Sequence, residues 1–166
     1  MKRLAAFFAV LFAVVAVDQA TKVLVRASSG PPRMYAHGTL ILLHTENTGA
    51  FLSLGADLPP WAKSLIFGGV VAVLLVMFTV AVVRGTIHRT GETIASAAVI
   101  GGGLGNLLDR ALRGGRVTDF LYIQLGSIHT GIFNVADMAI TFGVLWLVFT
   151  MSSGKKVGGG ELGVKD

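Results

Sequence analysis

The residues of this chain best suited to chemistry are two aspartates in its C-terminal half, Asp119 and Asp137. Two carboxyl groups that lie close together cannot both ionise readily, so one keeps a proton and the pair titrates as a unit. Such a pair supplies one base that activates water and one acid that protonates a carbonyl oxygen or a leaving amine. Two aspartates at this separation are common in sequences, so the pair is a hypothesis that the surrounding elements must support.

Further polar residues interrupt long apolar segments of the chain at a similar depth. They are Asp18 and Lys22 in segment 4–25, Asn106, Asp109 and Arg110 in segment 93–112, and Asp137 in segment 132–151. At about 1.5 Å of rise per helical residue, the first polar group of each segment falls about 20 Å from one membrane surface. An ionisable group in hydrocarbon is costly and usually faces a cavity or a partner. We therefore expect a shared polar layer, although side chains at helix ends can also extend to the interface.

The composition is that of an integral membrane protein. Hydrophobic residues make up 53% and charged residues only 14% of the 166 residues, and the mean hydropathy is +0.73; soluble domains of this size rarely carry so little charge. Four segments reach the roughly 20 residues needed to span a bilayer: 4–25, 62–83, 93–112 and 132–151. We predict an all-α membrane protein, a four-transmembrane-helix bundle with one domain over 1–151 and a disordered cytoplasmic tail over 152–166.

Two segments between the predicted helices read as strands. Residues 39–44 are short, branched and apolar, and residues 117–125 alternate in polarity and include Asp119. We expect them to pair into a small extracytoplasmic β-sheet. Residues 46–49 read as a turn, and the loop 45–58 is expected to close over the site.

The basic residues flank the helices and predict the orientation. Lys2 and Arg3 precede the first helix, and the loop 84–92 carries two arginines. The positive-inside rule then places both termini and this loop in the cytoplasm, with the polar layer open to the extracytoplasmic side. The net charge of +5 is explained by this topology and does not indicate nucleic acid. The N-terminal segment could also be a cleaved signal peptide, but three further spans favour a retained helix.

Other chemistries find little support. The chain has no cysteine, which excludes disulfides and thiolate sites. Its four histidines lack metal-ligand spacing, so we expect no metal and no cofactor. Gly101 and Gly105 are typical of close helix packing, not of a phosphate loop. Lys63 and Ser64 are adjacent in a predicted helix and point apart, so they do not form a Ser-Lys pair.

Five blocks of the sequence together resemble a known family. They are Asp18–Lys22, Asn47–Ala50, Gly101–Arg110, Val117–Phe120 and Phe133–Asp137. In this order, and over nearly the whole chain, they are similar to the signature blocks of lipoprotein signal peptidase (signal peptidase II), the bacterial aspartic peptidases that process prolipoproteins. One departure follows Gly49, where the chain reads Ala50-Phe51-Leu52-Ser53 and the family often has Ala-Ala-Phe-Ser.

The resemblance implies an activity and a set of site residues. Asp119 and Asp137 would be the catalytic pair. The substrate-binding residues would be Asn47, Gly49, Asn106, Asp109, Arg110 and Asn134, with Asp18 and Lys22 in structural support. The substrate would be a diacylglyceryl-modified prolipoprotein, cut before the modified cysteine in the bacterial inner membrane. We expect membrane lipids as further partners and a monomer.

Several residues and the function itself have alternative interpretations. Asp18 and Lys22, four apart on one helix face, could form only a structural ion pair, and Asp109 with Arg110 could simply end a helix. Asn106 and Asn134 could be polar residues of helix packing. The chain could also be a small transporter with a proton relay, but that requires polar residues in the inner leaflet, which are absent from the predicted spans. A non-enzymatic lipid-binding or assembly subunit is the third possibility.

Overall fold

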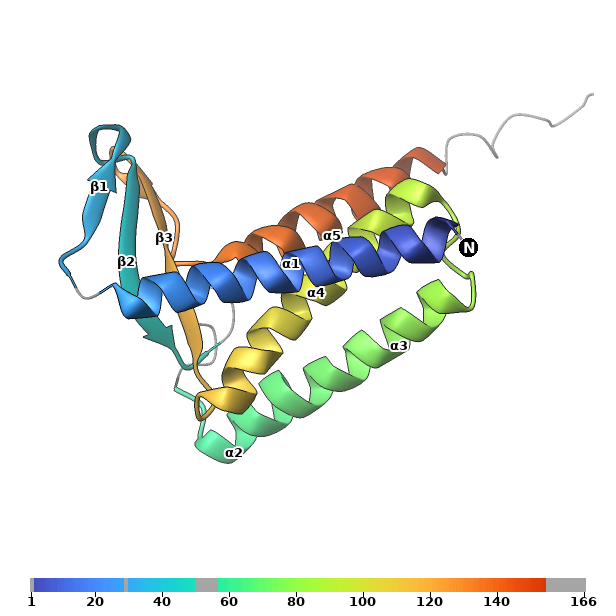
Figure 1. Ribbon diagram of the computed structural model, residues 1–166, viewed down its shortest axis with the longest axis horizontal. Helices are drawn as coiled ribbons and strands as arrows, with labels where there is room; N and C mark the ends of the chain where they lie inside the picture. Colours follow the sequence, from blue (N-terminus) through green and yellow to red (C-terminus); the bar gives the residue numbers. More distant parts are fainter. Residues whose placement is uncertain (1, 29, 50–56, 155–166) are drawn as a thin grey trace, which may run out of the picture.

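The computed structural model describes residues 2–28, 30–49 and 57–154. Its helices are α1 (Lys2–Ala27), the short 3-10 helix η1 (Ala36–Gly38), α2 (Pro60–Lys63), the π-helical segment η3 (Ser64–Val70), α3 (Val71–Val83), α4 (Thr90–Leu112) and α5 (Val135–Gly154). Because α2, η3 and α3 follow one another without a break, the bundle consists of four helical columns. Figure 1 shows the sheet at one end of these columns and the N-terminus at the other.

The outward surfaces of the helices carry large apolar side chains. Phe12, Met77 and Phe142 are each about two-thirds exposed, an arrangement that requires an apolar surrounding. The helices Lys2–Ala27 and Trp61–Val83 are long and apolar enough to cross a membrane, and α5 contains a shorter apolar stretch, Val135–Thr150. The predicted helix positions are confirmed in outline, with α1 and α4 each starting two or three residues earlier than expected.

Helix α4 lies at the centre of the bundle and packs tightly against α1 and α5 through glycines. A Cβ atom built on Gly102 would lie 2.5 Å from the Ala136 carbonyl oxygen of α5, and one on Gly101 would lie 2.9 Å from the Leu11 carbonyl oxygen of α1. Only glycine permits such close approach of two backbones. The prediction that Gly101 serves close helix packing is therefore confirmed, and the packing fixes the height of α4 against its neighbours.

The apolar core lies in the half of the bundle farther from the sheet. Its buried members are Phe7, Leu11, Leu75, Val82, Ala97 and Ile100. Toward the sheet the buried side chains become polar, as in the layer that the sequence predicts. The bundle is thus apolar at one end and holds a polar site at the other.

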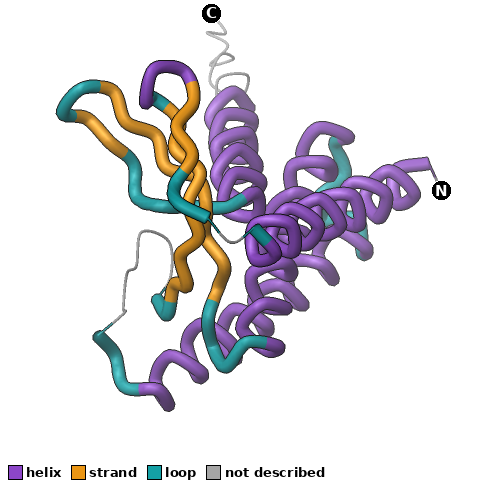
Figure 2. The backbone as a smooth tube through the Cα atoms, turned by 60° about the vertical axis from the view of Figure 1, so that its left-hand side comes forward, coloured by secondary structure: helices purple, strands orange, loops and turns teal. Residues whose placement is uncertain are grey.

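The sheet has four antiparallel strands in the order β1 (Arg33–Tyr35), β2 (Leu40–Asn47), β3 (Val117–Leu125) and β4 (Ile128–His129). Figure 2 shows the strands gathered on one side of the helices. The predicted pairing of the segments around 39–44 and 117–125 is confirmed. However, β2 continues to Asn47 instead of ending in a turn, which places Asn47 opposite Val117, two residues from Asp119. Strands β1 and β4 were not predicted.

The last helix differs from its predicted start in a way that matters for the site. Helix α5 begins at Val135, not at residue 132, so Asp137 lies in its first turn. Helix α5 ends at Gly154, and the predicted tail beyond it lies outside the described residues. Residues 50–56 also lie outside them, which includes the Ala50–Ser53 departure and most of the loop expected to close over the site.

Candidate active site

Asn134 and Asp137 cap the beginning of α5. The Asp137 backbone N–H donates to Asn134 Oδ1 (2.9 Å), and the Asn134 backbone N–H donates in return to Asp137 Oδ2 (3.3 Å). This reciprocal pair is a capping box, which satisfies two backbone donors at the helix start. It also places the Asp137 carboxylate at a helix N-terminus, where negative charge is favoured.

Asp119 lies at the buried beginning of β3, and its carboxyl group accepts hydrogen bonds from two side-chain amides. Asn47 Nδ2 donates to its Oδ2 (2.8 Å), and Asn134 Nδ2 donates to its Oδ1 (2.6 Å). Asn134 therefore touches both carboxyl groups, Asp119 through its side chain and Asp137 through its backbone N–H. The two aspartates of the sequence hypothesis come from different elements and meet at one bridging residue.

The Asp119 carboxyl group is set for proton transfer near neutral pH. Burial raises its pKa from 3.8 to about 6, against the hydrogen bond from Asn47, and the negative charge of Asp137 raises it further. The side chain has almost no contact with solvent, since Asp119 is only 2% exposed. A carboxyl group in this range can keep a proton while its neighbour is ionised, as an acid–base pair requires.

Asn106 links Asp137 to the interior of the bundle. Its Nδ2 donates to Asp137 Oδ1 (2.9 Å), and its Oδ1 accepts from Lys22 Nζ (2.8 Å) and from Asn134 Nδ2 (3.2 Å). Because the lysine can only donate, it fixes the orientation of the Asn106 amide. The amide then presents its N–H to the Asp137 carboxylate.

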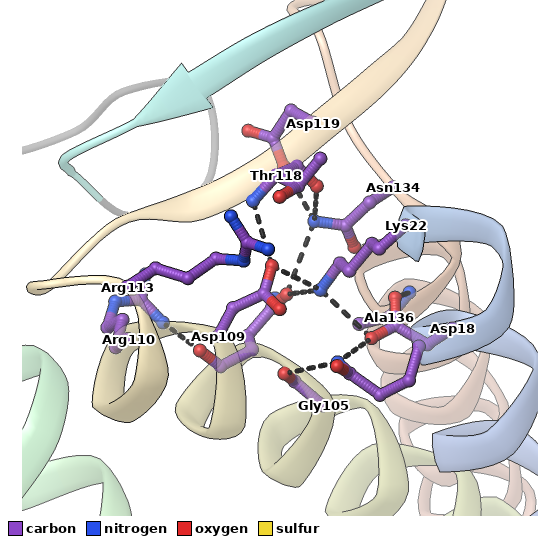
Figure 3. A network of polar contacts seen from close by, with 12 residues as sticks. Asp18, Lys22, Gly105, Asp109, Arg110, Arg113, Thr118, Asp119, Asn134 and Ala136 are labelled. Atoms are coloured by element: carbon purple, nitrogen blue, oxygen red, sulfur yellow. Dashed lines mark hydrogen bonds and ion pairs between the residues drawn. The ribbon is translucent and has the colours of Figure 1, made fainter. Parts of the chain in front are cut away.

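Lys22 is the centre of a buried charge cluster (Figure 3). Its Nζ lies 2.9 Å from Asp18 Oδ2 and 3.5 Å from Asp109 Oδ2, and Asp18 and Lys22 are both fully buried. Arg26 Nη1 adds a second cation 3.6 Å from Asp109 Oδ1. The cluster thus contains two acids and two bases. If one of these side chains lost its charge, an opposite charge of the cluster would stay buried without its partner.

The two acids of this cluster anchor the elements that carry the candidate catalytic pair. Asp18 Oδ1 accepts from the Ala136 backbone N–H (3.0 Å), which holds the first turn of α5. Asp109 Oδ2 accepts from the Thr118 backbone N–H (2.9 Å), one residue before Asp119. The cluster therefore positions both aspartates, one through each acid. This assigns Asp109 to support of β3, a contact that the sequence did not predict.

Gly105 makes this arrangement sterically possible. A Cβ atom at Gly105 would lie 2.5 Å from Asp18 Oδ2, so no other residue fits without displacing the carboxylate. The Gly105 carbonyl oxygen also accepts from Gln19 Nε2 (3.0 Å), which in turn donates to Asp18 Oδ2 (3.0 Å). The predicted Asp18–Lys22 pair is confirmed as a buried ion pair, and Gly105 provides the space for it.

Arg110 borders the site on its open side. Its Nη2 donates to the Gly49 carbonyl oxygen (2.9 Å), and its guanidinium carbon lies 5.5 Å from the centre of the Phe67 ring. The Gly49 backbone N–H donates to Asn47 Oδ1 (2.8 Å). Arg110 and Asp137 both line a cavity of about 410 Å³ between η3, α3, α4 and α5, with apolar walls that include Val71 and Ile140. We name this space the substrate cavity.

All ten residues singled out in the sequence therefore lie in this region, linked by hydrogen bonds or ion pairs. Sequence reasoning missed Arg26 and Thr118, whose side chains also hydrogen-bond to each other (3.1 Å). Arg26 lies four residues after Lys22 on the same helix face, which is the signal that could have found it. Within the described part of the chain, no group of three His, Asp or Glu side chains could hold a metal ion.

Comparisons with known proteins agree with this chemistry. The protein family described as Signal peptidase (SPase) II matches residues 10–153. The lipoprotein signal peptidase of Tolumonas auensis is 36% identical over 144 residues, which cover 83% of this chain and 84% of that protein. Those of Serratia marcescens and Desulforapulum autotrophicum are 35% and 36% identical, covering 85% and 82% of this chain and 81% and 85% of theirs.

The fold has a solved counterpart as well. A bacterial membrane enzyme structure determined by the in meso method at 2.3 Å resolution superimposes with a TM-score of 0.81, covering 97% of this chain and 95% of that one at 23% identity. That likeness shows the fold of a membrane enzyme. Together with the family match over most of its length, the comparisons show that this chain belongs to the signal peptidase II family of aspartic peptidases.

Proposed function

We propose that this chain removes the signal peptide from prolipoproteins by cutting before a diacylglyceryl-modified cysteine, with Asp119 and Asp137 as the catalytic pair. The observation that carries the assignment is the bridge through Asn134, which links the carboxyl group of Asp119 to that of Asp137 at the wall of the substrate cavity. The family supplies the reaction class, and the names of the relatives supply the lipoprotein substrate.

In this mechanism the two carboxyl groups share one proton. Asp137, at the helix N-terminus, is ionised and takes a proton from water as the water oxygen attacks the scissile carbonyl carbon. Asp119 holds the shared proton and gives it to the carbonyl oxygen. Asp137 then gives the proton it took from water to the amine nitrogen as the C–N bond breaks. A hydroxyl of the tetrahedral intermediate returns its proton to Asp119 as the new carboxyl group forms, so the pair is singly protonated again. No covalent enzyme intermediate forms.

The remaining polar residues hold this pair and the substrate. Asn47 and Asn134 orient Asp119, while Asn106 orients Asp137. Arg110 has planar donors suited to a substrate carbonyl or ester oxygen. Its Nη2 donates to the Gly49 carbonyl oxygen and its Nη1 to that of Asn106 (3.4 Å), which holds the guanidinium at the wall of the substrate cavity.

We further propose that all four helical columns span the inner membrane, with both termini cytoplasmic and the sheet outside. The charge pattern at the far end of the bundle supports this topology. Arg3 donates to the Ile87 carbonyl oxygen (3.1 Å) of the α3–α4 connection, so the N-terminus and this basic loop lie together, opposite the sheet (Figure 1). We also propose a monomer as the active unit.

The test is cleavage of a synthetic precursor by the purified protein in detergent. A peptide with a signal segment and a diacylglyceryl-modified cysteine should be cut at the single bond before that cysteine, as mass spectrometry of both fragments would show. The same peptide without the lipid should be cut far more slowly. Binding of the lipidated peptide without hydrolysis would instead support the non-enzymatic lipid-binding alternative.

A further inference from the structure

A second cavity, of about 430 Å³, lies beside the C-terminal end of α4. We name it the basic cavity, because Lys63, Arg110 and Arg116 line it and no acidic residue is among its described lining residues. Thr48, Gly68 and Leu107 form other parts of its wall. Arg110 also lines the substrate cavity, so the two spaces adjoin at that side chain without sharing the catalytic pair.

Two of the three positive charges of the basic cavity have no acidic partner in the described part of the chain, whereas that of Arg110 is attracted by the charges of Asp109, Asp119 and Asp137. Lys63 Nζ donates to Thr48 Oγ1 (3.3 Å), and neither Lys63 nor Arg116 forms an ion pair within the described residues. Glu46, on the nearby strand β2, is paired with Arg113 at 3.7 Å instead. Cations without a counter-ion around an open space favour an anion that brings several acceptor oxygens, and a phosphate does so.

The position of this cavity points to a lipid as the carrier of that phosphate. Lys63 lies at the start of the apolar helix Trp61–Val83, and Trp61 is 71% exposed, as expected of a side chain at the membrane interface. Basic pockets at this level bind the headgroups of anionic lipids. A phosphate in the headgroup layer would therefore meet Lys63 and Arg116 directly.

An apolar groove of about 430 Å³ continues from the basic cavity along the bundle. It runs over α4 between α1 and α3 and is lined by Phe8, Phe12, Leu75 and Leu104 among others. Leu107 lines both the groove and the basic cavity. Figure 1 shows α1 and α3 diverging toward the sheet. A charged pocket joined to an apolar groove matches a headgroup joined to an acyl chain.

We propose that the basic cavity and the apolar groove together bind one anionic phospholipid. Its phosphate contacts Lys63 and Arg116, and one acyl chain lies in the groove between α1 and α3. Because Arg110 faces the same cavity, the phosphate also helps to hold the guanidinium that borders the candidate active site. This site is separate from the substrate cavity and does not depend on the proposed peptidase activity.

The experiment measures lipid binding to the purified full chain in an uncharged detergent by native mass spectrometry. The probe is an equimolar mixture of phosphatidylglycerol and phosphatidylcholine with identical acyl chains. We expect a retained phosphatidylglycerol molecule in preference to phosphatidylcholine. The double variant Lys63→Gln, Arg116→Gln should reduce that preference about 30-fold, since each basic residue near an anionic headgroup contributes about fivefold.

Two further variants keep this test decisive. Arg33→Gln removes an exposed cation of β1 at the same end of the molecule and should leave the preference for phosphatidylglycerol unchanged. Gly68→Leu should weaken phosphatidylglycerol binding by filling the basic cavity, and it should fold because nothing lies within 4 Å of a Cβ atom at Gly68. Equal retention of the two lipids, or an unchanged preference in the double variant and in Gly68→Leu, would overturn the proposal.

A competition arm tests the contribution of the groove. Deacylated glycerophosphoglycerol, which carries the phosphate without acyl chains, should fail to displace the bound phosphatidylglycerol at equal concentration. Displacement at equal concentration would show a site for phosphate alone and would overturn the assignment of a lipid. Since no substrate is present, a failed peptidase assay would leave this result unaffected.

Discussion

Replacement of Lys22 by methionine tests whether the buried charge cluster supports the candidate active site. Lys22 Nζ lies 2.9 Å from Asp18 Oδ2 and 2.8 Å from Asn106 Oδ1. Methionine fills nearly the same space but supplies no charge. Asp109 keeps its contact with Arg26 at 3.6 Å, whereas Asp18 loses its only cation among the described residues and stays fully buried.

The expected loss follows from one buried carboxylate without a counter-ion. Such a group costs about 3–5 kcal/mol when its partner is removed. For a chain of this length, each kcal/mol shifts the unfolding temperature by about 2–4 °C. We therefore expect Lys22→Met to lower the unfolding temperature by roughly 6–20 °C. Cleavage should fall as well, because Asn106 loses the donor that orients its amide toward Asp137.

The assay is thermal unfolding of the purified protein in detergent, followed by tryptophan fluorescence. Asp18→Asn in the Lys22→Met background should recover at least half of the loss, because a neutral amide oxygen can still accept from the Ala136 N–H. Lys2→Met, an exposed lysine at the opposite end, should change stability by less than about 0.5 kcal/mol. An unfolding temperature for Lys22→Met equal to that of the wild type would refute the reasoning.

Three other predictions concern the same region. Gly105→Ala should lower the free energy of unfolding by about 1–3 kcal/mol and remove most of the cleavage activity, because its Cβ would lie 2.5 Å from Asp18 Oδ2. Gly68→Ala, with open space around its Cβ, is the matched control for thermal unfolding. Because the pKa of Asp119 is raised to about 6, its carboxyl group is protonated below that pH and loses the proton above it. We therefore expect kcat/KM for the lipidated peptide to fall as the pH rises through about 6. A kcat/KM that rises through this range would mean that Asp119 is the base and not the acid of the pair. Asn134→Ser keeps an oxygen that accepts from the Asp137 N–H at the helix cap, but it loses the amide that donates to Asp119. We expect kcat to drop at least tenfold, with KM and the unfolding temperature little changed. A raised KM with unchanged kcat would argue against a bridging role.

The sequence predicted that the polar side chains of the helices lie in one layer, but it did not predict all of their contacts. The depth of Asp18, Asn106 and Asp137 along their helices is a local property, and the rise per residue was enough to place them in one layer. Their hydrogen bonds through Lys22 and Ala136 confirm that layer. The resemblance of five sequence blocks to one family added the substrate class, which spacing alone cannot supply.

The incorrect predictions concern the residues at which helices and strands begin or end. The apolar run beginning at Ile132 hid the cap, although Asn134 followed three residues later by Asp137 matches a capping box. Strand β2 extends to Asn47 because β3 pairs with it to that point, a long-range contact that no local pattern contains. For the same reason, Thr118 and its backbone contact to Asp109 were missed.

The central claim is that Asp119 and Asp137 share the proton that drives hydrolysis, and its most direct test is replacement of each by asparagine. Asp57→Asn, at an exposed position, serves as the control. Each variant is purified, checked for folding by thermal unfolding, and given the lipidated precursor peptide under single-turnover conditions. We predict folded proteins with cleavage reduced at least a thousandfold for Asp119→Asn and Asp137→Asn, and unchanged for Asp57→Asn. Wild-type cleavage by either Asp119→Asn or Asp137→Asn would contradict the account.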